Sequence, residues 1–167
     1  EVVAMAKACN ADVEAEIGIV TGHEGKTFAI NDVSDAYTDP ELAARYVKDT
    51  GIDALAASVG TVHGFYATKP KLDFDRISEI AETISTPLVL HGGSGLSDSD
   101  FRTAVERGIS KVNIFTDINQ AGARAAGSGY REGIGLTDMI LPEIEAVKRS
   151  VMEKMRLFGS AGQASGR

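Results

Sequence analysis

The sequence has 167 residues, of which 43% are hydrophobic, 25% charged and 6% aromatic, a composition typical of one globular domain. Its net charge of −7 argues against nucleic acid as a main partner, because phosphate backbones are bound by basic surfaces. No apolar run approaches the roughly 18 residues that cross a membrane. The single cysteine, Cys9, excludes an internal disulfide and fits a reducing compartment, and we expect it to be buried. These features predict a cytoplasmic protein that binds neither nucleic acid nor a membrane.

The two ends of the chain carry signals of their own. Residues 1–9 have the pattern of the end of a helix and lack the basic and long apolar segments of a signal peptide. We therefore expect the sequence to be part of a longer protein. Residues 159–167 are rich in Gly, Ser and Ala, and we expect them to form a flexible tail on a single domain that spans residues 1–167.

Four segments predict β-strands. Residues 12–18 alternate polar and apolar side chains, which is the pattern of a half-buried strand. Residues 53–59 and 87–90 are apolar runs too short for helices, as expected for strands that are covered on both faces. Residues 111–115 predict the fourth strand.

Helical patterns follow these strands. Residues 40–50 are bounded by Asp39, a good N-cap, and by Gly51, which ends a helix. Residues 98–107 follow Ser97, which begins a variant of the capping box. Further helices are predicted at residues 74–84, 117–126 and 136–158.

The alternation of strands and helices predicts the fold class. Strands that are joined through helices lie parallel and are connected by right-handed crossovers. A closed (β/α)₈ barrel needs eight such units and about 250 residues, which is about twice what this chain provides. We therefore predict an α/β fold that holds about the C-terminal half of a TIM barrel, followed by a C-terminal helical extension.

Candidate metal ligands lie at the carboxyl ends of the predicted strands, where parallel α/β folds place their reactive groups. Glu14 and Glu16 share one face of the first strand. His63 and His91 each follow a strand and precede a glycine. Two imidazoles in matched register beside carboxylates are typical of a catalytic zinc site, which uses three protein ligands. The alternative is that both histidines are hydrogen-bonded residues of the core or of loops.

A candidate anion site follows the third predicted strand. Residues 91–97 form a glycine-rich turn between a strand and a capped helix, and such turns present a nest of backbone N–H groups to anions. Asn113 and Thr116 end the next strand and could complete a cradle for a phosphate group. The alternative is that these glycines only make a tight turn.

The segment of residues 21–25 is expected to be a long loop after the first strand. Gly22 and Gly25 would allow it to move, and Glu24 could then act as an acid or base on a closing lid. The alternative is a solvated loop carboxylate.

Four segments together resemble a known family. They read EAEIG at 14–18, VGTVHG at 59–64, LVLHGGSGLS at 88–97 and GISKVNIFTD at 108–117. In this order and spacing they are similar to the carboxyl-terminal portion of the class II, zinc-dependent ketose-bisphosphate aldolases, of the fructose- and tagatose-bisphosphate type. The similarity runs from about residue 10 to residue 158.

The resemblance implies a TIM barrel with a catalytic Zn²⁺ held by three histidines, two of which match His63 and His91. It implies that Glu16 lies near the metal as an outer or alternative ligand. It also implies that Glu24 is a catalytic residue on a mobile loop, and that a monovalent cation, Na⁺ or K⁺, accompanies the substrate phosphate. The positions that match the substrate and phosphate site are Gly64, Gly92, Gly93, Ser94, Asn113, Ile114, Phe115 and Thr116.

The activity that the resemblance implies is the reversible aldol cleavage of a ketose 1,6-bisphosphate to dihydroxyacetone phosphate and glyceraldehyde 3-phosphate. Such a reaction belongs to carbohydrate metabolism, including glycolysis, and the resemblance suggests a homo-oligomer, a dimer or larger. The family takes its third histidine and a catalytic aspartate from a His-x-Asp-His stretch, which this sequence lacks. Phe115 stands where many fructose-bisphosphate enzymes carry Asp, so the choice between fructose- and tagatose-bisphosphate stays open.

Two other interpretations remain at this point. A metal-independent phosphosugar enzyme would keep the barrel and the phosphate site, although His63 and His91 argue against it. A truncated half-barrel would have no activity and would bind only anions or a partner chain. We expect the 167 residues by themselves to be inactive as an aldolase.

Overall fold

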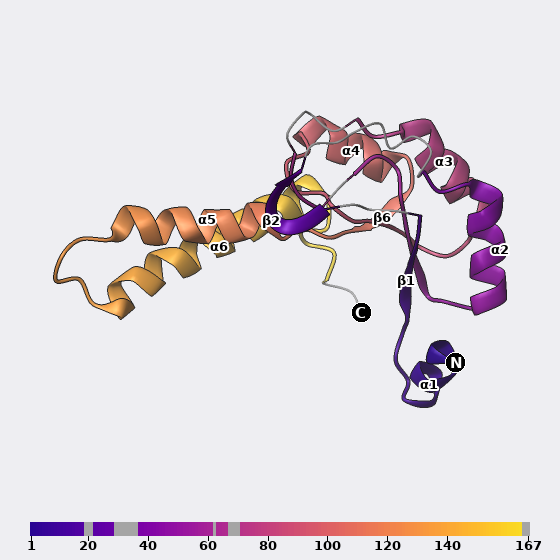
Figure 1. Ribbon diagram of the computed structural model, residues 1–167, viewed down its shortest axis with the longest axis horizontal. Coiled ribbons are helices and arrows are strands. Elements are labelled where there is room, and N and C mark those ends of the chain that lie inside the picture. The colour runs from indigo at the N-terminus through magenta and orange to yellow at the C-terminus, as the bar shows by residue number, and fades with distance from the viewer. Residues whose placement is uncertain (19–21, 29–36, 62, 67–70, 165–167) are drawn as a thin grey trace. The chain divides into compact units, whose positions relative to one another are not determined.

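The computed structural model describes residues 1–18, 22–28, 37–61, 63–66 and 71–164, with the backbone alone described in 22–28 and 63–66 (Figure 1). The chain divides into two compact units, Glu1–Asn113 and Ile114–Arg167, and each is described by itself below. The single domain expected from the sequence stays a prediction.

The first unit is built on a parallel sheet of four strands in the order β1-β3-β5-β6. The alternation of strands and helices in the sequence predicted this arrangement, and the structure confirms it. The last strand begins and ends earlier than the predicted residues 111–115. The strand ends at Val112, although the backbone N–H of the next residue, Asn113, still donates to the carbonyl of Leu90 (3.0 Å). The strands are β1 (Glu14–Ile17), β3 (Ala54–Ala57), β5 (Leu88–Leu90) and β6 (Ile109–Val112).

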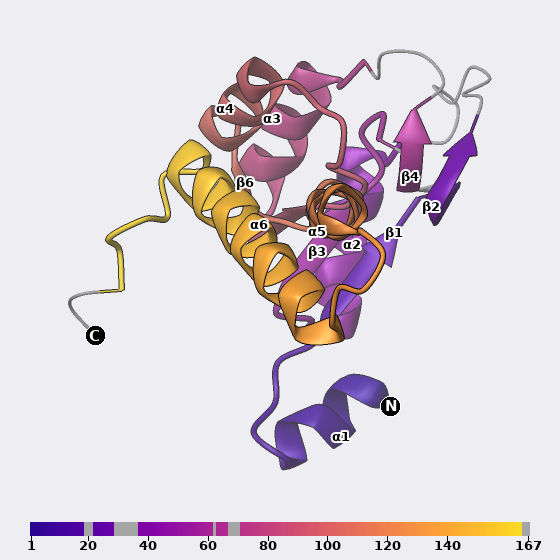
Figure 2. The ribbon, with the colours of Figure 1, turned by 90° about the vertical axis from the view of Figure 1, so that its left-hand side faces the viewer.

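Three helices connect these strands. The order of the strands in the sheet follows their order in the chain. Right-handed crossovers between such neighbouring strands place all three helices on the same face of the sheet (Figure 2). The ends of the helices carry the predicted caps: Asp39 accepts from the N–H of Leu42 (2.9 Å), and Gly51 adopts a left-handed φ of 67°. The helices are α2 (Pro40–Thr50), α3 (Phe74–Thr83) and α4 (Asp98–Glu106), and a short α1 (Val2–Ala8) precedes the sheet.

The hydrophobic core lies between these helices and the sheet. Register places Leu55 beside Leu88 and Leu88 beside Ile109, so the three side chains form one row on the same face. All three are buried, with at most 5% of the side chain exposed. The helices contribute buried side chains to this core, namely Ala43, Ile77, Ile80, Phe101 and Ala104.

The opposite face of the sheet carries charged residues. Register pairs Glu16 with Ala56, Ala56 with Val89, and Val89 with Lys111 across the four strands. Residues paired in this way project to the same face, so Glu16 and Lys111 lie on the face away from the helices. The register of β5 and β6 shifts between Leu88 and Val89, which oppose Ile109 and Lys111 respectively.

A second, two-stranded parallel sheet pairs β2 (Gly22–Phe28) with β4 (His63–Tyr66). The expectation of a loop at residues 21–25 is therefore wrong for the described part, residues 22–25. Extended backbone pairs there with a segment about 40 residues further along the chain, and glycines at 22 and 25 give no local signal of such a pairing.

The second unit is a helical hairpin of α5 (Thr116–Gly129) and α6 (Leu136–Leu157). A Cβ atom added to Gly122 of α5 would lie 3.1 Å from Cγ2 of Val147 in α6, so the absence of a side chain permits this close packing. Lys154 of α6 forms an ion pair with Asp117 of α5 (3.1 Å). The hairpin confirms both predicted helices, with α5 extending further than expected.

Two further expectations concern the surface. Cys9 is exposed, so the prediction of a buried cysteine is wrong: it lies after the end of α1, a helix without buried residues. Within the described ranges, no helix is both long enough and apolar enough to cross a membrane.

Candidate active site

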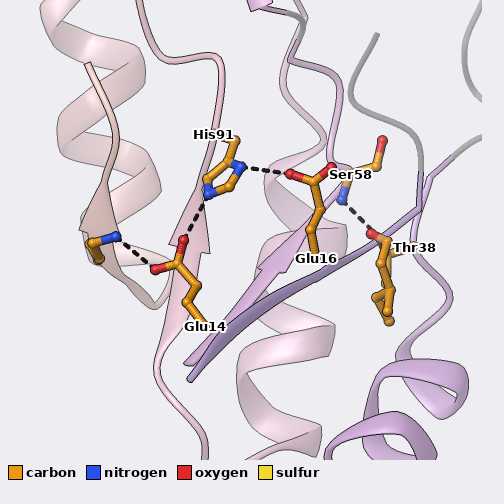
Figure 3. A network of polar contacts seen from close by, with 7 residues as sticks. Glu14, Glu16, Thr38, Ser58 and His91 are labelled. Carbon is orange, nitrogen blue, oxygen red and sulfur yellow. Dashed lines mark hydrogen bonds and ion pairs between the residues drawn. The ribbon is translucent and has the colours of Figure 1, made fainter. Parts of the chain in front are cut away.

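His91 lies between two carboxylates at the carboxyl edge of the four-stranded sheet (Figure 3). Its Nε2 atom is 2.9 Å from Oε1 of Glu14, and its Nδ1 atom is 2.6 Å from Oε2 of Glu16. The imidazole is mostly buried, with 17% of the side chain exposed. While both carboxylates are ionised they can only accept, so both contacts are hydrogen bonds at the same time only when both ring nitrogens carry a proton.

Glu14 also forms an ion pair with a lysine side chain. Nζ of Lys111 donates to Oε2 of Glu14 at 2.7 Å, while the other oxygen of the carboxylate contacts His91. Partial burial by itself raises the pKa of Glu14, but the hydrogen bonds from Lys111 and His91 and their charges outweigh it. The pKa of Glu14 is therefore lower than the ordinary value of a glutamate, and this carboxyl is ionised at neutral pH.

The pattern of the strands explains why these groups meet. Glu14 and Glu16 are two residues apart, so both project from the same face of β1. Their partners in β3 are Ala54 and Ala56, whose small side chains leave room for the longer ones beside them. His91 follows two residues after Val89, which lies on the same face. The sequence reasoning placed both glutamates on this face but missed Lys111.

Thr38 joins the carboxyl ends of β1 and β3. Its hydroxyl donates to the carbonyl of Ile17 and accepts from the N–H of Ser58, both at 2.9 Å. The backbone N–H of Thr38 donates to the carbonyl of Ser58, also at 2.9 Å. Because Thr38 is buried, these bonds fix the edge of the sheet next to Glu16. Nothing in the local sequence distinguishes this threonine from an ordinary loop residue.

The other predicted metal and catalytic residues are placed by their backbone alone. His63 begins β4 and Gly64 follows it, while Glu24 lies within β2. The register pairs Gly22 with His63, so the segments that hold Glu24 and His63 lie in adjacent strands. Their side chains lie outside the described part of the structure.

Among the side chains that the structure describes, no group of three or more His, Cys, Asp or Glu residues could hold a metal ion. Glu14 and Glu16 contact opposite nitrogens of the His91 ring, so the three groups do not converge on one point. His91 and Glu16 offer one nitrogen and one oxygen to the same region, which are donor atoms that zinc accepts.

The predicted phosphate turn directly follows His91. Gly92 and Gly95 have φ angles of 67° and 89°, which favour glycine. Gly92, Gly93 and Ser94 are buried. The first turn of α4 already holds Asp98 and Asp100, and Asp100 completes the capping box with Ser97. An anion at this turn would therefore depend on backbone N–H groups more than on the helix dipole.

The remaining predicted substrate residues lie where the two units join in sequence. Asn113 is the last residue of the first unit and is exposed. Ile114, Phe115 and Thr116 begin the second unit. The Phe115 side chain is 52% exposed, whereas Thr116 starts α5 and is buried.

The sequence matches the family model of the class II fructose-bisphosphate aldolases over residues 1–163. The chain belongs to this family. A relative in the family is the YdjI protein of Escherichia coli K12, whose function is uncharacterised, and which is 39% identical over 154 residues. This match covers 91% of the chain and 53% of YdjI, so the chain spans about half the length of that relative.

Solved structures of this family share the fold. The crystal structure of the YdjI aldolase superimposes with a TM-score of 0.79 at 34% identity, covering 98% of this chain and 54% of that one. A protein from Coccidioides immitis, provisionally assigned as a fructose-1,6-bisphosphate aldolase, gives a TM-score of 0.86 at 29% identity, with coverages of 99% and 58%. With the four parallel strands and their helices, these likenesses identify about half of a TIM barrel.

Proposed function

We propose that the protein containing this chain catalyses the reversible, metal-dependent aldol cleavage of a ketose 1,6-bisphosphate. The substrate would be fructose- or tagatose-bisphosphate, and the products dihydroxyacetone phosphate and glyceraldehyde 3-phosphate. Membership of the class II aldolase family supports an aldolase-type lyase. The observation that carries the proposal is the placement of His91 between Glu14 and Glu16 at the carboxyl edge of the sheet.

In this proposal the metal is Zn²⁺, and His91, His63 and Glu16 are its ligands within this chain. The donor atoms of His91 and Glu16 fit zinc, since imidazole nitrogens and carboxylate oxygens are among its usual ligands. The same donors would also accept cobalt or iron. When bound, the metal supplies a Lewis acid for the substrate carbonyl and hydroxyl oxygens.

The other predicted residues bind and orient the substrate. We assign the phosphate to the backbone N–H groups of the turn at Gly92, Gly93 and Ser94, because glycine-rich turns with positive φ angles form such nests. A phosphate held there would orient the reacting carbons. A Na⁺ or K⁺ ion would accompany it. The further members of this site are Gly64, Asn113, Ile114, Phe115 and Thr116.

Glu24 is proposed to exchange the proton of dihydroxyacetone phosphate. Support comes from the backbone of β2, which carries Glu24 in the strand next to the one that begins with His63. We also propose that the protein is cytoplasmic, acts in carbohydrate metabolism such as glycolysis, and forms a dimer or larger homo-oligomer. The 167 residues span 53% of YdjI and lack a His-x-Asp-His stretch, so we expect them to be inactive alone.

The test is an aldol-cleavage assay of the complete protein with fructose- and tagatose-bisphosphate, before and after treatment with a chelator. We expect one zinc per chain, loss of activity with the chelator, and recovery on addition of zinc. His91→Ala and His63→Ala should lose both metal and activity, whereas the matched variant His23→Ala should keep its metal. Chelator-resistant cleavage would instead support the metal-independent enzyme. Absence of bound zinc, together with an apparent molecular mass in solution that depends on protein concentration, would support the alternative of an inactive half-barrel.

A further inference from the structure

Four side chains contact one another in series through His91. The first two, Lys111 and Glu14, are not among the proposed metal ligands. Lys111 donates to Glu14 (2.7 Å), Glu14 contacts Nε2 of His91 (2.9 Å), and Nδ1 of His91 contacts Glu16 (2.6 Å). Lys111 lies on β6 and Glu14 on β1, which are the two outer strands of the sheet. The chain of contacts therefore crosses the whole polar face.

The two carboxylates beside His91 are not equivalent. One oxygen of Glu14 is held by Lys111, and the other faces Nε2. Glu16 has no lysine or arginine partner among the residues that the structure describes, and its side chain is 34% exposed. Both carboxylates contact the ring, but only Glu14 is also held by a lysine. Of the two, Glu16 is therefore the carboxylate that can turn toward a metal.

This difference distinguishes the two nitrogens of the ring. A metal on a histidine needs one ring nitrogen without a proton, and the other nitrogen then donates to a neighbouring acceptor. Glu14 provides such an acceptor for Nε2–H, since its ionised carboxylate can only accept. Nδ1 then remains on the side of Glu16, where the metal is proposed.

We propose that Glu14, anchored by Lys111, is a positioning residue that holds the Nε2–H of His91 and thereby presents Nδ1 to the metal. This inference rests on the proposed function, because it assumes that His91 is a metal ligand. Lys111 has two effects in this arrangement. It fixes the orientation of the Glu14 carboxylate, and its charge keeps that carboxylate from competing with Glu16 for the metal.

The experiment measures zinc affinity and the protonation of the His91 ring in the complete protein, independently of activity. Zinc affinity is obtained by competition with a chromophoric chelator. The ring nitrogen that carries the proton is read from ¹⁵N NMR of histidine-labelled protein, with the signals of His91 assigned through His91→Gln. In the zinc-loaded wild-type protein we expect the proton on Nε2 and the metal on Nδ1.

Variants separate positioning from a general loss of structure. Lys111→Met and Glu14→Ala should weaken zinc binding by about 10–100-fold, the usual effect of removing a group that orients a metal ligand. Lys111→Arg restores a cation beside Glu14 and should recover most of the affinity. Glu14→Gln keeps the shape of the side chain and replaces Glu14→Ala if that variant does not fold. Lys148→Met, which removes a lysine from the exposed pair with Glu145, is the matched control and should bind zinc like the wild type.

The outcomes distinguish the inference from the proposed function. If the wild-type protein binds no zinc, the proposed metal site is wrong and the inference falls with it. If the wild type binds zinc but the Glu14 and Lys111 variants bind it equally well, the inference alone is wrong. Zinc on Nε2 of His91, with the proton on Nδ1, would also overturn the inference while leaving the metal site in place.

Discussion

On one face of the four-stranded sheet Leu55, Leu88 and Ile109 lie side by side and are buried under helices. On the other face, one row of paired residues runs from Glu16 to Lys111. The same strands thus carry an apolar row on one face and, on the other, a row with a charged residue at each end. The apolar face gains free energy from burial, whereas each charge on the polar face requires a partner to offset its desolvation.

The helical face thus holds the core of this unit, whereas the polar face holds the proposed metal ligands His91 and Glu16. Close-packed side chains on the helical face would be sensitive to any loss of volume. The ion pairs of the polar face are partly exposed, and such pairs contribute little to stability. We therefore expect changes on the helical face to affect folding, and changes on the polar face to affect metal binding.

The largest effect is expected from truncation in the core. Phe101→Ala removes a fully buried ring from α4 and should lower the free energy of unfolding by about 3–5 kcal/mol. The same truncation at Phe115, a residue that is 52% exposed, should cost less than about 1 kcal/mol. Urea denaturation of both variants provides the measurement. Equal losses would mean that the core does not lie under α4.

A smaller effect is expected at the helix cap next to the site. Ser97→Ala removes the hydroxyl that accepts from the N–H of Asp100 (3.2 Å), and should cost about 1 kcal/mol of stability while leaving zinc binding unchanged. Ser99→Ala is the control: its hydroxyl contacts that of Ser97 (2.8 Å) and is not the group that accepts from the N–H of Asp100, so we expect a smaller loss than for Ser97→Ala. A loss of zinc affinity in Ser97→Ala would contradict the separation of stability and metal binding at this edge of the sheet.

The smallest effect is expected from the titration of Glu14. Since the pKa of Glu14 is lower in the folded protein than in the unfolded chain, its contribution to stability is present above the unfolded pKa. That contribution is lost as the pH falls through the folded pKa. The stability advantage of the metal-free wild type over Glu14→Gln should therefore shrink below about pH 4, measured by denaturation across a pH series. The control compares the wild type with Glu132→Gln, a change at an exposed glutamate. If the difference in stability between the wild type and Glu14→Gln did not change with pH, the expectation would be refuted.

Local patterns were enough to predict the elements of the four-stranded sheet and its helices. Asp39 and Gly51 mark α2 to the residue, because caps act within one turn of a helix. The strand β2 was missed because its pairing with β4 is set by distant contacts. Of the candidate site, the strand-end position of His91 and the shared face of Glu14 and Glu16 were predicted from the strand pattern, but the contacts between them were not. Lys111 was missed because its partner, Glu14, lies 97 residues earlier in the chain.

The register shift between β5 and β6 has a consequence for how this charge network can change. Ile109 and Lys111 are two residues apart, yet they oppose Leu88 and Val89, which project to opposite faces. Ser110 is the extra residue of this bulge, and it turns Lys111 away from the core and toward Glu14. Deleting one residue here would send the ammonium group under the helices although every charged side chain remained. The number of residues in β6 therefore determines the charge network as much as their identity does. Insertions or deletions in this strand would disrupt the network more than most substitutions.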